Sequence, residues 1–190
     1  MNYKEEFLSI YQNVIKRNGK DEFLSWLLKS DFFTAPASSK FHLCYEGGLC
    51  EHSINVYKRL KNLIENEYGE NWENTISHES VAIIGLLHDI CKVNCYKVEY
   101  RNVKVDGNWE QKPYYVFDED LPYGHGEKSV YIINGFMRLT REEAICINWH
   151  MGGFDQRAEG TAMQKAYYQF PVALLTHIAD IQATYLDEKD

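Results

Sequence analysis

A histidine and an aspartate stand side by side in the segment LLHDICK, residues 86–92, at the end of a strongly apolar run. A buried carboxylate is costly unless a cation or strong hydrogen-bond donors compensate it, and a metal ion can also use the adjacent imidazole. Neighbouring side chains on a helix point about 100° apart, so His88 and Asp89 can share one ion near a helix end. Lys92 follows one turn after His88, where it could contact a phosphate or balance the charge of Asp89.

A second carboxylate is expected to be buried near the C-terminus. His177 and Asp180 are three residues apart in an otherwise apolar stretch, so they share one face of the predicted helix. This face again requires a cation, because an uncompensated carboxylate is unfavourable among apolar side chains.

Three further histidines occur beside glycines or helix ends. His52 closes the segment GGLCEH (residues 47–52), His125 lies in GHGE (124–127), and His150 lies in WHMGG (149–153). Each has an ordinary interpretation when taken alone, such as a helix-entry turn for His52 or a C-terminal cap for His150. Only the combination of these residues with the two carboxylates indicates a metal site.

Length and composition are typical of one globular domain. The chain has 190 residues, of which 45% are hydrophobic and 25% charged, and its formal net charge is −8. An acidic chain is a poor ligand for long nucleic acid, because phosphates are neutralised by clustered Lys and Arg. No apolar run approaches the ~20 residues of a membrane span, and the N-terminus lacks a signal-peptide pattern. The odd number of cysteines, five, favours reduced thiols and a cytoplasmic location.

The apolar periodicity predicts a mainly helical chain. We expect a helix over residues 3–17, a second one capped by Asp21, an irregular segment over 31–48, a helix over 49–67 and a buried helix over 77–91. Three more helices are predicted at about 126–137, 140–150 and 170–186, the second with a Thr140–Glu143 capping box and the third with Pro171 in its first turn.

The pattern changes between Tyr96 and Phe117, where β-branched and aromatic residues alternate with polar ones. Asp106-Gly107 divides this stretch and is typical of a tight turn. We therefore expect one β-hairpin at about 96–118, inserted between helices, and its role as a lid or as an interaction edge stays open.

The ordered set of histidines and aspartates resembles the HD superfamily of metal-dependent phosphohydrolases. The segments FHLCYEGGLCEH (41–52) and LHDICK (87–92) are most similar to the HD module of bacterial 3′–5′ exoribonucleases that join an OB-fold to an HD domain. This resemblance covers about residues 35–185. It implies a mainly α, HD-domain-like helical bundle and a single domain over 1–190, in which the N-terminal helices of 1–34 pack on an HD core at 35–185.

The resemblance also implies a role for each residue of the set. Lys92 matches a lysine that contacts the substrate phosphate in some branches, His42 matches a histidine near the pocket, and His177 is expected behind the ligands, so these three are the candidate substrate-binding residues. His78 matches nothing and is expected at the surface. One ion would be held by His52, His88, Asp89 and Asp180, and in two-metal branches Asp89 would bridge to a second ion held by His125 and His150.

Mixed imidazole and carboxylate ligands suit one or two ions of Mn²⁺, Fe²⁺, Co²⁺, Ni²⁺ or Zn²⁺ better than Mg²⁺. Such an ion lowers the pKa of a bound water from 15.7 to about 7, which supplies a nucleophile for in-line attack on phosphorus. The predicted catalytic residues are Asp89, Lys92 and His125, and His125 could protonate the leaving oxygen if it is not a ligand.

We therefore expect a metal-dependent phosphohydrolase, a phosphomonoesterase or phosphodiesterase, that acts on a nucleotide or another small phosphate ester. One alternative is a 3′–5′ exonuclease on short RNA or single-stranded DNA, for which Trp109, Lys112, Tyr114 and Tyr115 are candidate contacts. It is less favoured because 190 residues leave no room for an OB-fold beside the HD module. A second alternative is a non-catalytic metal- or nucleotide-binding module. A homo-oligomer stays open.

Overall fold

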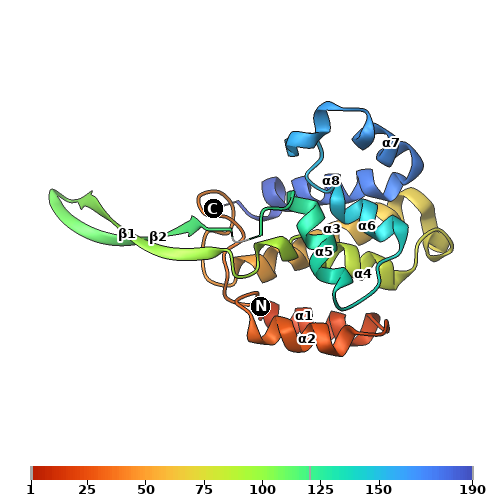
Figure 1. The fold of residues 1–190 in the computed structure, drawn as a ribbon, viewed down its shortest axis with the longest axis horizontal. Helices are drawn as coiled ribbons and strands as arrows, with labels where there is room; N and C mark the ends of the chain where they lie inside the picture. Colours follow the sequence, from red (N-terminus) through yellow and green to blue (C-terminus); the bar gives the residue numbers. More distant parts are fainter. Residues whose placement is uncertain (1, 120, 190) are drawn as a thin grey trace.

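The computed structural model describes residues 2–119 and 121–189 and has a mainly helical body with one β-hairpin (Figure 1). The α-helices are α1 (Tyr3–Val14), α2 (Lys20–Lys29), α3 (Gly48–Tyr68), α4 (His78–Leu87), α5 (His125–Asn134), α6 (Arg141–Asn148), α7 (Ala162–Gln169) and α8 (Pro171–Gln182). The short 3₁₀ helices are η1 (Gly69–Asn74), η2 (Ile90–Lys92), η3 (Gly152–Phe154) and η4 (Gln156–Glu159), and η5 (Ala183–Asp187) is a π-helix. The predicted fold class is confirmed.

Helices α3, α4 and α8 form the centre of the body and carry most of the candidate site. Helix α3 packs against both α4 and α8, and residues 80–87 of α4 are all buried. The approach of α4 to α3 depends on Gly85, because a Cβ atom there would lie 2.5 Å from the Cα of Tyr57. A side chain at this position would push the two helices apart and separate His52 from His88.

The N-terminal helices share the same hydrophobic core. Phe7 and Tyr11 of α1 are fully buried in the cluster that also contains residues of α3, α4 and α8. Helix α1 contacts α3 and α4 directly. The predicted division into N-terminal helices and an HD core stays a prediction.

The hairpin consists of β1 (Tyr96–Val105) and β2 (Asn108–Phe117), paired antiparallel from Tyr96↔Phe117 to Val105↔Asn108. Asp106 and Gly107 both have positive φ angles, 48° and 88°, as the tight turn predicted from their types requires. Most of both strands is exposed, and the hairpin projects from the helical body in Figure 1. The inserted hairpin is confirmed.

Several predicted boundaries are wrong, and each has a local cause. Helix α1 ends at Val14 instead of residue 17, and Asp21 does not cap α2, whose N-cap is Gly19 with φ 88° and no capping side chain. Gly19 is required there because a Cβ would lie 1.9 Å from the carbonyl oxygen of Phe136. At the N-cap of α2, close packing against the backbone of Phe136 thus takes the place of a capping side chain.

The predicted buried helix over 77–91 ends four residues early, at Leu87. His88 is its C-cap, and Asp89 leaves the α-helical conformation with φ −104° and ψ 20° before η2 begins. A continuous helix would have held the two side chains about 100° apart, whereas here His88 Nε2 and Asp89 Oδ2 lie 3.6 Å from each other.

The C-terminal half follows the prediction closely where capping signals exist. The capping box of Thr140 and Glu143 is present at α6, and Pro171 occupies the first turn of α8. Helix α5 ends three residues before the predicted residue 137, and the last predicted helix continues beyond α8 as η5. The segment containing η3, η4 and α7 was not predicted as helical; η3 and η4 have three and four residues, and α7 has eight, of which Ala166 is buried.

Across the described ranges, no helix is long and apolar enough to span a membrane. Four of the cysteines, Cys50, Cys91, Cys95 and Cys146, are buried free thiols.

Candidate metal centre

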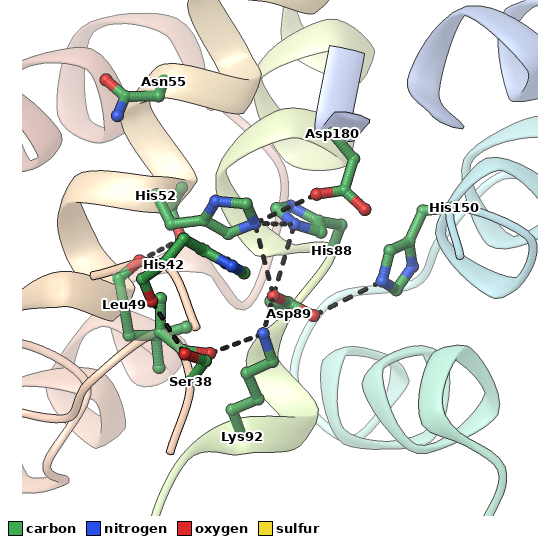
Figure 2. A network of polar contacts seen from close by, with 12 residues as sticks. Ser38, His42, Leu49, His52, Asn55, His88, Asp89, Lys92, His150 and Asp180 are labelled. Carbon is green, nitrogen blue, oxygen red and sulfur yellow. Dashed lines mark hydrogen bonds and ion pairs between the residues drawn. The ribbon is translucent and has the colours of Figure 1, made fainter. Parts of the chain in front are cut away.

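Four side chains predicted from distant parts of the sequence meet in the interior (Figure 2). His52 comes from the first turns of α3, His88 and Asp89 from the end of α4, and Asp180 from α8. The Nε2 atom of His52 lies 3.2 Å from Nε2 of His88 and 3.2 Å from Oδ1 of Asp180. The predicted convergence of these stretches is therefore present in the fold.

The atoms that face one another in this cluster are acceptors. His88 donates its Nδ1 proton to the carbonyl oxygen of Gly85, 2.9 Å away, so its Nε2 carries a lone pair. His52 Nδ1 lies 3.0 Å and 3.1 Å from the two carboxylate oxygens of Glu188 and must donate to them. The Nε2 atoms of His52 and His88 and the Asp180 carboxylate all face one another as acceptors. Only a proton or a metal ion between them can satisfy this arrangement.

The pKa shifts agree with a cation-binding position. Burial lowers the pKa of His88 to about 3, so this imidazole is neutral and able to bind a metal. Burial also lowers the pKa of His52, but its hydrogen bonds to Asp180 and Glu188 outweigh burial and raise the pKa to about 10. Positive charge is thus favoured at His52 Nε2, the point where the acceptors converge.

The two oxygens of Asp89 face two different groups of ligands. Its Oδ2 lies 3.6 Å from the Nε2 atoms of both His52 and His88, whereas its Oδ1 lies 2.8 Å from His125 Nε2 and 3.4 Å from His150 Nε2. Burial raises the pKa of Asp89, but the charge on Lys92 and the neighbouring imidazoles hold it well below its usual range. Asp89 is therefore an ionised carboxylate placed between the two groups.

The second group contains a buried nitrogen without a hydrogen-bond partner. His150 donates its Nδ1 proton to the carbonyl oxygen of Ile147 at 2.6 Å, and within the part of the chain that the structure describes its Nε2 has no hydrogen-bond partner. Its charged neighbour is Asp89, whose Oδ1 lies 3.4 Å away, and a buried nitrogen that makes no hydrogen bond is costly in a protein interior. Beside it, burial lowers the pKa of His125, which is therefore a neutral imidazole.

These observations fit a metal ion at each of two adjoining positions. The sets of three ligand atoms that lie within 4.8 Å of one another include His52–His88–Asp180, His88–Asp89–His150 and His42–His52–Glu188. A further set combines Asp89 and His125 with Cys91, whose Sγ lies 3.4 Å from His125 Nδ1. The mixed nitrogen and oxygen donors match those expected for divalent transition metals.

Lys92 and His42 lie at the edge of the cluster. The ammonium group of Lys92 lies 2.7 Å from Asp89 Oδ2 and also donates to the carbonyl oxygen of Ala37. Burial lowers the pKa of Lys92, but Asp89 more than offsets this and raises it, so the group is charged. The ring of His42 lies 4.9 Å from that of His52, and burial lowers its pKa.

Two further histidines differ in how close they come to the cluster. His177 donates from Nδ1 to the backbone carbonyl of His150 at 2.7 Å, which places it behind that candidate ligand; its predicted contact with substrate stays a prediction. His78 lies elsewhere, half-buried against Trp72 and hydrogen-bonded to the hydroxyl of Tyr57. It is less exposed than a surface position implies.

Glu188 is a member of the site that the sequence did not reveal. Its carboxylate is fully buried, binds His52 Nδ1 and accepts a further hydrogen bond from Asn55. In the sequence it belongs to the charged tail DEKD (residues 187–190), which looks like an ordinary solvated end. Its role depends entirely on a contact across 136 positions of the chain, for which no local signal exists.

The cluster opens into a pocket of about 590 Å³, a size suited to a small molecule. Seven of the polar residues described above line it, together with several apolar side chains. Trp109, Lys112, Tyr114 and Tyr115, the candidate nucleic-acid contacts, are not among the described residues that line it. The lining residues are Phe41, His42, His52, Asp89, Lys92, His125, Met151, Phe154, Asp180, Ile181, Thr184, Tyr185, Glu188 and Lys189.

A local similarity to a characterised enzyme class adds to this geometry. Over 61 residues, the chain is 39% identical to a dihydroneopterin 2′,3′-cyclic phosphate phosphodiesterase of Methanocaldococcus jannaschii. The matched stretch covers 30% of this chain and 23% of that protein. No family model and no solved structure matches the chain. The resemblances to the HD superfamily and to the exoribonuclease module stay predictions.

Proposed function

We propose that this protein is a metal-dependent phosphohydrolase that cleaves a small phosphate ester, with phosphodiester hydrolysis of a nucleotide-like compound as its first candidate reaction. The observation that carries the proposal is the convergence of His52, His88 and Asp180 on one buried point, with ionised Asp89 beside them. The partial similarity to a cyclic phosphate phosphodiesterase supports the same class of chemistry.

In this proposal the first ion is held by His52, His88, Asp89 and Asp180. Asp89 would bridge to a second ion held by His125 and His150, because its two oxygens already face the two groups separately. Ions at these positions would polarise a phosphoryl oxygen and lower the pKa of water. A one-ion enzyme remains within the proposal, and then His125 is free for proton transfer.

The chain itself supplies the remaining parts of the reaction. Lys92 presents a charged ammonium group to the pocket and can bind a non-bridging phosphate oxygen. Glu188 fixes the tautomer of His52 by accepting the Nδ1 proton, which leaves Nε2 for the ion. His125 lines the pocket and is neutral, so it could serve the leaving oxygen as an acid only after taking up a proton, which Asp89 at 2.8 Å would favour.

Metal ions also explain how an acidic protein can bind an anionic substrate. The net charge of −8 gives no general attraction for phosphate, and Asp89, Asp180 and Glu188 add negative charge within the pocket wall. Divalent ions would reverse the local sign of charge at the place where a phosphate must bind.

The test is a screen of small phosphate esters with and without Mn²⁺, using Asp89→Ala as the control. We expect Mn²⁺-dependent opening of nucleoside 2′,3′-cyclic phosphates, or hydrolysis of another small ester, and a loss of about 10³-fold in the variant, since metal catalysis is worth several kcal/mol. Equal turnover by Asp89→Ala would refute the catalytic assignment.

A further inference from the structure

Three aromatic side chains stand exposed around the mouth of the pocket. Phe41, Phe154 and Tyr185 are 79%, 67% and 59% exposed, and all three line the same pocket as the metal cluster. We call these three residues the aromatic rim. Single exposed aromatic residues are common on protein surfaces, but several around one opening mark a binding site.

The rim is assembled from three separate parts of the chain. Phe41 belongs to the irregular segment before α3, Phe154 ends η3, and Tyr185 lies in η5 beyond α8. No single amphipathic element therefore explains their exposure. The ring of Phe154 also lies 6.5 Å from the ring of His177, which in turn supports His150, so one side of the rim is tied to the candidate ligands.

The pocket thus has a charged floor and an apolar opening. The floor contains Lys92 and the carboxylates of the cluster, while Met151 and Ile181 extend the apolar surface of the rim. A ligand that matches both parts has a phosphate at one end and a flat apolar group at the other. Simple sugar or alkyl phosphates match only the floor.

From this arrangement we propose that the aromatic rim binds a planar heteroaromatic group carried by the phosphate ester, such as a purine or a pterin. Aromatic side chains stack on such rings with little dependence on their exact substituents. This inference rests on the proposed function, because it assigns the phosphate of the same ligand to the metal cluster.

Equilibrium binding of phosphate monoesters to Mn²⁺-loaded protein tests the rim, because the ions supply the positive charge that the phosphate needs and a phosphodiesterase does not turn such ligands over. Calorimetry with guanosine 5′-monophosphate and ribose 5-phosphate compares two ligands that share a phosphate and differ in the base. We expect the nucleotide to bind about tenfold or more tightly, the range given by stacking of one base. Phe154→Ala and Tyr185→Ala should remove most of this difference and leave binding of ribose 5-phosphate unchanged.

Tyr168→Ala is the matched control, since Tyr168 is 89% exposed on α7 and does not line the pocket. Phe154→Leu keeps an apolar side chain but removes the ring, so it should also lose the discrimination. Equal affinities for the two ligands, or an equal loss in Tyr168→Ala, would overturn the proposal. Rim-dependent nucleotide binding without hydrolysis of any ester would support the rim while refuting the proposed function.

Discussion

Buried carboxylates occur in two regions of this molecule, and their surroundings differ. Glu143 is fully buried, yet Arg17 donates to both of its oxygens and the backbone N–H of Thr140 donates to it at 2.7 Å. In the metal centre, Asp180 and Asp89 face imidazole nitrogens instead of a guanidinium group. In the first region a guanidinium group compensates the carboxylate. In the second, Lys92 contacts one oxygen of Asp89, and the carboxylates otherwise face imidazoles that can release a proton to make room for an ion.

This difference distinguishes charged groups that stabilise the fold from charged groups that can take part in a reaction. Burial raises the pKa of Glu143, but the hydrogen bonds from Arg17, Thr140 and Ser80 together with the charge of Arg17 lower it, so the carboxylate stays ionised within a satisfied network. The histidine cluster has neutral His88, and its His150 Nε2 makes no hydrogen bond and lies 3.4 Å from Asp89 Oδ1, an arrangement suited to metal binding. The two regions should therefore respond differently to substitution and to added metal.

The largest expected effect on stability comes from Arg17→Met. This variant leaves the carboxylate of Glu143 buried without its cation, which typically costs about 3 kcal/mol or more. Chemical denaturation should show this loss equally with and without Mn²⁺. A loss that disappears when Mn²⁺ is added would mean that the two regions are not independent.

Asp180→Asn is the matching change in the metal centre. Wild-type protein should gain about 2.7 kcal/mol at a Mn²⁺ concentration 100 times its Kd, and Asp180→Asn should lose most of that gain. Thermal unfolding of both proteins with increasing Mn²⁺ measures it. The same metal-induced rise in the variant would remove Asp180 from the set of ligands.

A smaller effect is expected from Glu188→Gln. Glutamine can still accept the Nδ1 proton of His52 but no longer carries the charge that favours it, and loss of such a partner lowers metal affinity by about 10-fold or more. Calorimetric titration with Mn²⁺ measures the change. Asp187→Asn is the control, because Asp187 pairs with Arg59 at the surface; equal losses in both variants would show a general charge effect.

The smallest effect concerns acid stability. Because the pKa of Glu143 is lowered in the folded protein, its ionised form contributes stability that is fully present above the usual carboxyl pKa of about 4.3. This contribution is lost as the pH falls through the lowered value. The difference in unfolding free energy between wild type and Glu143→Gln should therefore shrink in acid, and a difference independent of pH would contradict the assignment.

The sequence predicted those features that depend on local chemistry. Thr140 and Glu143 formed the expected capping box, and Asp106-Gly107 formed the expected turn, because both depend on neighbouring residues. Gly19 replaced Asp21 at the start of α2 because a distant backbone, at Phe136, comes too close for a side chain. Packing between remote segments decided that position.

The candidate site shows the same division between residues that the sequence reveals and residues that only the fold reveals. Asp89 and Asp180 stood out because buried carboxylates need compensation, and His88 because it adjoins Asp89. His52 was joined to them through the resemblance to the HD superfamily, and the four side chains converge in the fold. Glu188 was not recognised, since nothing near it in the sequence distinguishes it from a solvated tail residue. Residues that support a ligand from behind leave little trace in a single sequence.

The central claim is that His52, His88, Asp89 and Asp180 hold a divalent ion. Anomalous diffraction from crystals of the wild-type protein soaked in Mn²⁺ tests it most directly, because the signal places the ion itself. We predict a peak among these four side chains, which disappears in Asp89→Ala. Peaks confined to surface carboxylates, with none among the four, would contradict the account.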